Sequence, residues 1–563
     1  MECQTPTVSL RSLVNDFHRG AIQLPQFQRD YVWKPNKIRN LLDSLHKGYP
    51  IGGFYLWRPK VDTLRDDKPQ AFGSRQIQSE FKGYLIDGQQ RLTSLEAAFG
   101  LYTGEDKRGD ALRCYLDLGA RDDNQVRVTR IFVTYAGNAS VQRRVDDEGD
   151  STLIPLRDLF RGQDPDLREK TKDALESRKW SSTKIDTALK RFDLTCEMLN
   201  QLVPCTTVSD IPDKDAIEVF KRLNKGGTPL RESDVQAAKL ARGRAVNVLK
   251  RMREFVNGEL PQRLGFGFSF AFRSLVIFHK ETAKLRTLSE DWIEDRGPHG
   301  RSLSESWQVG HRSIEKALSF VNEKMGWSHR ALLPSANAVI VLAAAFDKAS
   351  FKQDSETEAL YRRWLCLSAL RGVFQGSVES TINRFLRAIR DSRSHPAVAL
   401  VKELKRAERG AIHADELTNY AQMWGPATQV MHSWLVSQGA KDWLSEDMID
   451  KLARGGDTSL PGGDLTVHHI FPRNLLKDYV ESPDDVNRMA NYALLSRSTN
   501  AKFGQLRPDE VLAMLNPAQR CLAASQFFGD GAGDQLQAQR YTEFCDWRAE
   551  RLTESINAWL GIE

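Results

Sequence analysis

The sequence has few of the features that would place a protein in a membrane or outside the cell. None of its 563 residues lies in an apolar run of about 18 residues, the length that crosses a bilayer. The N-terminus, Met-Glu-Cys-Gln-Thr-Pro, lacks the basic segment and apolar core of a secretory signal. The seven cysteines are scattered without a Cys-x-x-Cys pair, which argues against a zinc ribbon and for a reducing compartment. We therefore expect a cytoplasmic protein that has no membrane association.

The chain also lacks a strong excess of charge of either sign. It carries 80 basic and 74 acidic residues, a net charge of +6, within a composition that is 40% hydrophobic and 27% charged. Binding to nucleic acid would then depend on local basic patches. Repeats and low-complexity segments are absent from the sequence as well, and the length predicts about three or four domains.

Hydrophobic spacing divides the chain into three regions and predicts a multidomain α+β fold. Residues 1–235 mix short strands with helices, of which 36–47 has the clearest helical spacing. The strands are expected at residues 53–57, 84–86, 111–118 and 130–135.

The remaining two regions differ from the first in their periodicity. Residues 236–455 place apolar side chains every three to four positions and are predicted to be mostly helical, most clearly at 335–346 and 360–374. Residues 456–563 begin with a glycine-rich loop, continue with a short strand and end in an amphipathic helix expected over 535–560.

The most informative motif lies at the start of this last region, where an apolar strand ends in His468 and His469. Asn491 and Asn500 follow downstream. A phosphodiesterase that uses one metal ion needs a base to take a proton from water and donors that hold a divalent cation against the phosphate. Neighbouring side chains of a strand point apart, so the two histidines are not expected to bind the same ion. The alternative is a pair of structural histidines in a small domain.

A second motif, Asp87-Gly88-Gln89-Gln90-Arg91, follows an apolar strand in the N-terminal region. Gly88 permits a tight turn from strand to helix, and the open amides of a helix N-terminus attract phosphate. Arg91 would add a bidentate clamp, and Asp87 would hold a cation or orient a water. The alternative is a common Asp-Gly turn followed by a solvated helix start.

Three further segments are polar or basic, and each has a structural alternative. Residues 23–33 are rich in groups that stack on bases or bind phosphates, but they would equally form a hairpin packed by Phe27, Tyr31 and Trp33. Residues 220–230 have the pattern of a connector between two helices. A basic run that would face either DNA or solvent comprises Lys239, Arg242, Arg244, Lys250, Arg251 and Arg253.

The N-terminal segments, in this order, resemble the GmrS-type domain of GmrSD restriction enzymes, which is related to the ParB nucleotide-binding fold. The resemblance covers about residues 1–235 and implies a domain that binds and hydrolyses a nucleoside triphosphate (NTP). Asp87 would belong to its catalytic group. The implied nucleotide-binding residues are Gln28, Arg29, Asp87, Gly88, Gln89, Gln90, Arg91 and Asn224.

Residues 465–512 resemble the GmrD-type HNH domain of the same enzymes, a ββα-metal nuclease finger. The resemblance implies that His469 is the general base, that His468 and Asn500 bind the metal, and that Asn491 holds the base in place. The first metal ligand of such fingers is often acidic. The imidazole of His468 therefore favours Mn²⁺, Co²⁺ or Ni²⁺ beside Mg²⁺. Flanking phosphates would contact basic residues that are otherwise solvated, namely Arg473, Lys477, Arg488, Arg497, Lys502 and Arg507.

Together the resemblances imply a modification-dependent (type IV) restriction endonuclease, in which NTP binding and hydrolysis control metal-dependent cleavage of modified phage DNA. The mark would be a modified cytosine or a phosphorothioate backbone, and assembly as a homodimer would be one way to couple the two activities. Two alternatives stay open: an HNH nicking effector of a phosphorothioate-based defence system, and a nucleotide-dependent DNA-binding protein with an inactive nuclease.

Overall fold

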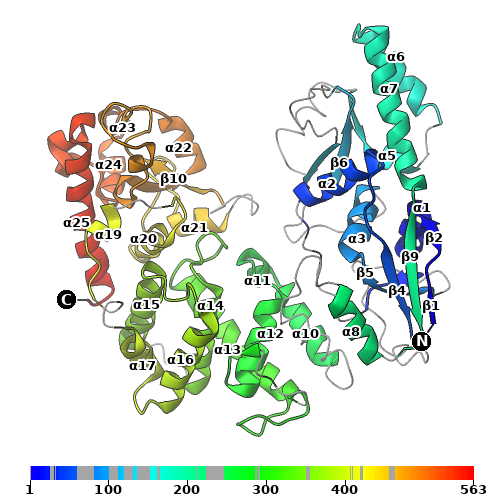
Figure 1. Ribbon diagram of the computed structural model, residues 1–563. Helices are drawn as coiled ribbons and strands as arrows, with labels where there is room; N and C mark the ends of the chain where they lie inside the picture. Colours follow the sequence, from blue (N-terminus) through cyan, green and yellow to red (C-terminus); the bar gives the residue numbers. More distant parts are fainter. Residues whose placement is uncertain are drawn as a thin grey trace. The chain divides into compact units, whose positions relative to one another are not determined.

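The chain forms two compact units, Met1–Arg242 and Gly243–Glu563, shown in Figure 1. None of the described helices is both long and apolar enough to cross a lipid bilayer. The computed structural model describes residues 2–25, 31, 33, 35–59, 81–99, 112–119, 131–135, 152–161, 165–211, 213–223, 246–285, 288, 292–349, 355–405, 408, 410–418, 422–455 and 463–562.

The first unit is a mixed α+β structure whose strands pair in the order β1-β9-β4-β5-β3, with β2 beside β9. Strands β4 and β9 are parallel, and β4 and β5 are antiparallel. A second sheet has the order β7-β6-β8. The elements of this unit are β1 (Glu2–Gln4), β2 (Thr7–Ser9), α1 (Leu10–His18), β3 (Ile22–Gln23), α2 (Pro35–His46), β4 (Phe54–Arg58), β5 (Gly83–Asp87), α3 (Gln89–Ala98), β6 (Leu112–Asp117), β7 (Ile131–Tyr135), β8 (Leu153–Pro155), α5 (Leu156–Arg161), α6 (Leu167–Ser177), α7 (Ser182–Glu197), β9 (Leu202–Ser209) and α8 (Asp213–Leu223).

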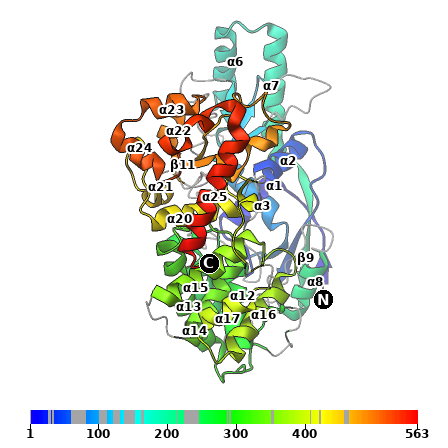
Figure 2. The same cartoon turned by 90° about the vertical axis from the view of Figure 1, so that its left-hand side faces the viewer.

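Helices α1 and α3 illustrate how the sequence builds the core of this unit. Ser9 caps α1 by accepting a hydrogen bond from the amide of Ser12, which satisfies one open donor of the first turn. Leu10, Leu13, Val14 and Phe17 then repeat at helical spacing and are buried in the same apolar core as Leu92 and Leu95 of α3. Helices α6 and α7 form a hairpin that projects from the unit in both Figure 1 and Figure 2, and Arg168 pairs with Asp193 across it.

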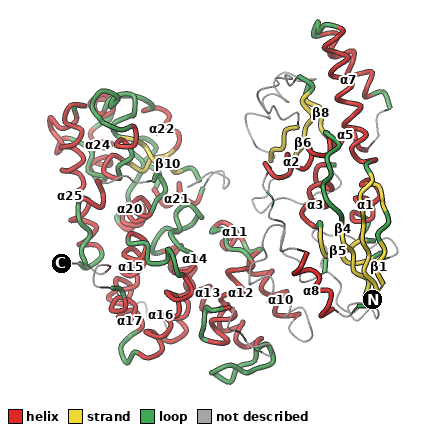
Figure 3. Tube along the Cα trace, viewed as in Figure 1, coloured by secondary structure: helices red, strands yellow, loops and turns green. Residues whose placement is uncertain are grey.

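The second unit is mostly helical, as the colours of Figure 3 show. Its helices pack in neighbouring pairs, including α12 with α13, α13 with α14, and α15 with α17. Its elements are α10 (Val246–Val256), α11 (Glu259–Arg263), α12 (Phe268–Lys280), α13 (Leu303–Glu323), α14 (Ala336–Lys348), α15 (Ser355–Leu370), α16 (Val378–Asp391), α17 (Pro396–Glu403), α19 (Asp415–Thr418), α20 (Pro426–Ser437), α21 (Ile449–Arg454), β10 (Leu465–His469), β11 (Tyr492–Ser496), α22 (Arg497–Phe503), α23 (Pro508–Met514), α24 (Pro517–Ala524) and α25 (Tyr541–Trp559).

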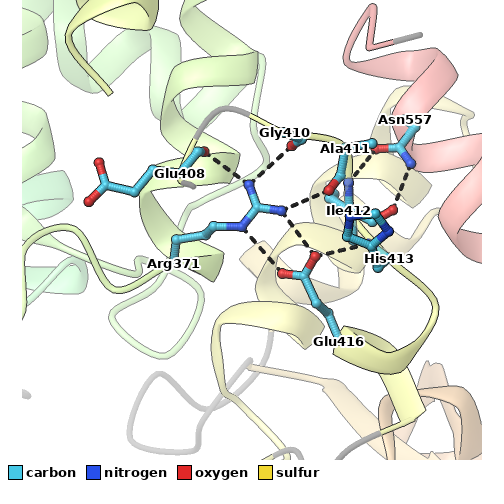
Figure 4. A network of polar contacts seen from close by, with 8 residues as sticks. All are labelled: Arg371, Glu408, Gly410, Ala411, Ile412, His413, Glu416 and Asn557. Atoms are coloured by element: carbon cyan, nitrogen blue, oxygen red, sulfur yellow. Dashed lines mark hydrogen bonds and ion pairs between the residues drawn. The ribbon is translucent and has the colours of Figure 1, made fainter. Parts of the chain in front are cut away.

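A network around Arg371 joins the helical part of this unit to α25 (Figure 4). The guanidinium donates to both carboxylate oxygens of Glu416 and to the backbone carbonyls of Glu408, Gly410 and Ala411. Asn557 of α25 holds the same segment by bonding the backbone N–H and C=O of Ile412. Because each nitrogen of the guanidinium already donates to a protein oxygen, this cluster is a structural tie.

The α+β fold class is confirmed, and most predicted elements lie within one or two residues of their expected positions. Two predicted helices have different bounds in the structure. Helix α15 begins at Ser355 and ends at Leu370, because Gly372 takes a left-handed φ of 58° and residues 371–374 form turns. The last helix begins at Tyr541, because residues 535–540 form 3₁₀ turns that follow Gly533 at a φ of 50°.

Candidate functional site

Strands β10 and β11 and helix α22 form a compact ββα arrangement in the second unit. The two strands are antiparallel, with His468 opposite Ala493 and His469 opposite Tyr492. Helix α22 contacts both strands, and Ser496 caps it by accepting a hydrogen bond from the amide of Thr499. The alternation of a strand gives the histidines different surroundings, since His468 is buried and His469 is half-buried.

His468 and Asn500 meet at the centre of this arrangement. The Nδ1 atom of His468 lies 2.7 Å from Oδ1 of Asn500. Burial lowers the pKa of His468 to about 4, against a smaller opposing effect of the Asn500 hydrogen bond, so the imidazole is neutral near pH 7. Neighbouring ligands of an octahedral ion with bonds of 2.0–2.1 Å are roughly 2.9 Å apart. The spacing suits one divalent cation, which would take the place of the proton that Nδ1 of His468 donates to Oδ1 of Asn500 in this structure.

His469 is held by a residue that the sequence did not single out. Its Nε2 atom lies 3.1 Å from Oδ1 of Asn487, the residue that ends the 3₁₀ turn Pro483–Val486. Because a carbonyl oxygen only accepts, Nε2 carries the proton and Nδ1 keeps its lone pair. Burial lowers the pKa of His469, and Asn487 opposes that shift. The imidazole is thus a neutral group with one basic nitrogen, which is the state that a general base requires.

Asn491 fixes the loop that follows β10. Its side chain is fully buried, accepts a hydrogen bond from the N–H of Phe471 and donates to the carbonyls of Phe471 and Val486. Its own carbonyl accepts from the N–H of Ile470. Asn491 therefore holds the backbone directly after His469 and acts as a positioning residue, while its side chain makes no bond to the imidazole among the described contacts.

Five of the six basic residues around the motif fall into different classes. Arg488 and Arg507 lie near acidic side chains, and Arg497 donates to the carbonyl of Gly463. Lys477 and Lys502 are exposed, and neither forms an ion pair with a residue that the structure describes. The two lysines are therefore better placed than these arginines to contact phosphate.

The N-terminal motif forms a tight turn between β5 and α3. Gly88 has a φ of 101°, a left-handed conformation that favours glycine, and a Cβ atom there would clash with the ring of Phe54. Asp87 ends the strand, and Gln89 and Gln90 begin the helix as buried side chains. The sequence thus predicted correctly that a strand leads through glycine into a helix N-terminus.

Arg91 makes more contacts within the protein than its expected role requires. Its guanidinium donates to the carbonyls of Ile51 and Gly53 and to the carboxylate of Asp87, and it lies over the ring of Phe54. Burial lowers the pKa of Arg91, although Asp87 opposes the shift. The Arg91 side chain therefore clamps the turn before β4 to the end of β5.

Two other predicted segments lie close to this turn. The hydroxyl of Tyr31 is 2.8 Å from that of Ser94 on α3, and Trp33 packs against the core of the unit. Helix α8, which ends at Leu223, contacts β5. Gln28, Arg29 and Asn224 themselves, like Phe27 and the first three residues of the basic run after residue 238, lie outside the described residues.

The structure also contains buried polar residues near the ββα arrangement that the sequence did not reveal. Asp442 accepts four hydrogen bonds, two of them from the β11–α22 junction. Arg548 of α25 is fully buried and donates to the carbonyls of Gln526 and Ala490. Neither residue lies in a recognisable motif, because the contacts that tie Asp442 to the β11–α22 junction and Arg548 to its two carbonyls span more than 20 residues of the chain.

Comparison with known proteins identifies the N-terminal unit. Residues 10–241 match the family model for the N-terminal domain of GmrSD restriction endonucleases. The match covers less than half of the chain. It confirms the predicted resemblance of the N-terminal region to the N-terminal domain of these enzymes. The match ends at residue 241, so the roles of His468, His469, Asn491 and Asn500 stay predictions.

A curated relative adds a shorter match. The chain is 32% identical over 100 residues to an uncharacterized protein of Methanocaldococcus jannaschii. The matched segment covers 17% of this chain and spans 17% of the length of that relative.

Proposed function

We propose that the chain is a type IV restriction endonuclease in which the N-terminal unit binds and hydrolyses an NTP and residues 465–503 cut modified phage DNA. The observation that carries the proposal is the contact of 2.7 Å between Nδ1 of His468 and Oδ1 of Asn500. The neutral His469 follows His468 on the same strand. The match of residues 10–241 to the N-terminal domain of GmrSD restriction endonucleases supports DNA as the substrate.

In the proposed reaction each side chain of the ββα arrangement has one task. His468 and Asn500 would hold a divalent cation, which supplies charge stabilisation for the phosphate and the leaving oxygen. His469 takes a proton from water at Nδ1, while Oδ1 of Asn487 accepts a hydrogen bond from Nε2–H and fixes the tautomer. A base positioned in this way is worth about 10²- to 10⁴-fold in rate. Asn491 keeps the loop after the base in place.

The neutral donors have a consequence for substrate binding. No cluster of three or more acidic, histidine or cysteine side chains that could hold a metal occurs in the described part of the chain. Two neutral ligands leave the charge of a divalent ion uncompensated, and a DNA phosphate would supply the missing negative charge. Cation and DNA would therefore bind cooperatively, and thiophilic or nitrogen-tolerant ions such as Mn²⁺ would compete well with Mg²⁺.

The N-terminal turn supports a controlling nucleotide site. Gly88 lets the backbone approach a ligand closely, and α3 starts there without a side-chain cap. Asp87 retains a partly exposed carboxylate that would orient water or a cation next to the triphosphate. NTP hydrolysis would then report on the state of bound DNA before the nuclease acts, with a homodimer as one assembly that would link the two events.

The deciding experiment is a cleavage panel with the full-length protein. Phage genomes carrying glucosylated cytosine, phosphorothioate linkages or no modification are incubated with Mg²⁺, Mn²⁺, Co²⁺ or Ni²⁺, each with and without ATP and GTP. We expect cleavage of one modified genome only, dependent on metal and changed by nucleotide. Nicks confined to phosphorothioate DNA would instead favour the nicking effector. Absence of cleavage in every arm would contradict the proposal.

A further inference from the structure

Asp442 lies outside the ββα arrangement in sequence but is bonded into it. The residue follows α20 and is fully buried. One carboxylate oxygen, Oδ1, accepts the backbone N–H of Ser496 at 2.6 Å. The other, Oδ2, accepts the hydroxyl of Thr499 at 2.5 Å and the N–H groups of Leu444 and Ser445. A single side chain thus connects the 442–445 loop to the junction between β11 and α22.

The contacts of Asp442 fall next to the atoms that would bind metal. Ser496 is both the last residue of β11 and the cap of α22, and Thr499 directly precedes Asn500. Fixing residues 496 and 499 fixes the start of the helix, and with it the direction in which Asn500 extends toward His468. A buried negative charge at the first turn of a helix is also favourable, since the helix dipole is positive there.

The loop that carries Asp442 is itself firmly packed. Trp443 is fully buried and stacks on Phe528 with ring centroids 4.9 Å apart. Lys441 and Met448 form a backbone bridge across the base of the loop, and the N–H of Asp442 donates to the carbonyl of Asp447. The carboxylate therefore stands on a rigid support, as a group that positions another side chain must.

We propose that Asp442 is a positioning residue for the metal site, so that the functional nuclease domain begins before residue 442. This inference rests on the proposed function of His468 and Asn500. The helical region then supplies one of the supports of the nuclease, and it cannot separate from β11 and α22 without loosening the contact between the two metal ligands.

The Asp442→Asn substitution tests the charge and the acceptors at nearly constant volume. All four groups around the carboxylate are donors, whereas an amide offers one acceptor oxygen and an NH₂ group that donates. In either orientation of the amide, the NH₂ group faces a donor. The turn between β11 and α22 must then shift or lose a hydrogen bond.

The measured quantity is the affinity for Mn²⁺, and electron paramagnetic resonance reports the concentration of free Mn²⁺. The samples contain sheared phage DNA of the kind that the wild-type protein cleaves. His469→Ala in the full-length chain serves as the parent, because it removes the base and leaves both ligands. In this background we expect Asp442→Asn to weaken Mn²⁺ binding by about 10–100-fold, the range found for groups that orient metal ligands. The matched control Asp447→Asn, an exposed acid of the same loop, should bind like the parent.

Thr499 provides a second test that does not depend on how well Asp442→Asn folds. Thr499→Val removes only the hydroxyl bond and should also weaken Mn²⁺ binding, whereas Thr499→Ser keeps the hydroxyl and should restore it. Circular dichroism of each variant verifies that the helical content is unchanged. Parent-like Mn²⁺ affinity in a folded Asp442→Asn variant, or in Thr499→Val where Asp442→Asn does not fold, would overturn the inference.

A third variant separates this inference from the proposed function. His468→Ala in the same background removes a ligand and should abolish measurable Mn²⁺ binding. If His468→Ala binds Mn²⁺ like the parent, the metal site itself is wrongly assigned, and the role of Asp442 is overturned with it. If His468→Ala loses Mn²⁺ while the Asp442 and Thr499 variants bind normally, only the positioning role is overturned.

Discussion

The two candidate sites of this protein use their polar motifs in opposite ways. At the turn between β5 and α3, the guanidinium of Arg91 is bonded to Ile51, Gly53 and Asp87, so the most conspicuous charge of the motif supports the backbone. In the ββα arrangement, the side chains of His468 and Asn500 bond each other, and this contact does not support the backbone. A motif therefore combines residues that build a turn with residues that are free for chemistry, and only the contacts distinguish them.

The sites also differ in charge. Asp87 and Arg91 form an ion pair with little exposure, so this pair largely compensates itself. His468 and Asn500 are neutral donors, and a doubly charged ion between them would attract negative charge from outside the protein. The first site is thus suited to hold a ligand by shape and backbone contacts, and the second to hold a cation together with a phosphate.

The largest expected effect separates the two sites. His469→Ala should reduce DNA cleavage by about 10²- to 10⁴-fold, because it removes the only basic nitrogen proposed to activate water. NTP hydrolysis by the same variant should stay at the wild-type level. Cleavage is measured on the phage genome that the wild-type protein cuts, and hydrolysis by phosphate release.

The converse variant is Asp87→Ala, which should lose NTP hydrolysis and leave the ligand set of the nuclease intact. If His469→Ala cuts DNA normally, the general base is another group. If Asp87→Ala hydrolyses NTP normally, the nucleotide site has been placed in the wrong turn.

Local pattern was sufficient for most of the fold and for part of the sites. Helix α2 and strands β4–β7 were predictable because their apolar spacing is a property of neighbouring residues. Gly88 was predictable because a strand, a glycine and a helix follow directly in sequence. The end of α15 has a local cause that the prediction overlooked, a left-handed Gly372 at a φ of 58°, whereas the Arg371 network was not predictable because it reaches residues up to 45 positions away.

The same limit applies to the residues that support the nuclease. Asp442 and Ser496 are 54 positions apart, and His469 and Asn487 are 18 apart. Nothing in the segments that hold Asp442 or Asn487 marks them as functional. Arg548 is a stronger case, since a charged side chain on the buried face of α25 contradicts the apolar stripe expected there. It is accommodated because carbonyls of Gln526 and Ala490 accept its hydrogen bonds.

Acid should weaken the unit that carries the ββα arrangement through His432 of α20. Burial lowers the pKa of this histidine to about 4, so the folded state keeps it neutral. Its stabilising contribution is complete above an unfolded pKa of about 6.5 and is lost as the pH falls from there toward 4. Lowering the pH from 7 to 5 should therefore reduce the free energy of unfolding by about 2 kcal/mol through this histidine.

The His432→Leu variant measures this contribution directly. Urea titrations at pH 7 and at pH 5 give the free energy of unfolding. From pH 7 to pH 5 this free energy should fall by about 2 kcal/mol less in the variant than in the wild-type protein. The control His413→Gln changes an exposed histidine of the same unit and should keep the wild-type pH dependence. Equal losses in wild type and His432→Leu would show that His432 is not buried as a neutral group.

Arg91 tests whether the N-terminal motif is a structural clamp. Arg91→Ala leaves the carbonyls of Ile51 and Gly53 without their donor and should cost about 1–3 kcal/mol of local stability. Hydrogen exchange in peptides from residues 50–58 and 83–99 should accelerate accordingly. Arg91→Lys should recover only part of the loss, because an ammonium cannot reproduce the fork of donors. Unchanged exchange with lost NTP binding would mean that Arg91 is a ligand group, and the contrast between the two sites would disappear.

The smallest expected effect concerns the exposed lysines near the ββα arrangement. If Lys477 and Lys502 contact DNA phosphates, replacing either with alanine should reduce the slope of log affinity against log salt by about 0.9. Arg507→Ala should change that slope less, because Asp509 and Glu510 already lie 3.2–3.3 Å from its guanidinium. DNA binding is measured in the His469→Ala background at several salt concentrations. Equal changes in slope for Lys477, Lys502 and Arg507 would show that acidic neighbours do not decide which of these cations meets the DNA.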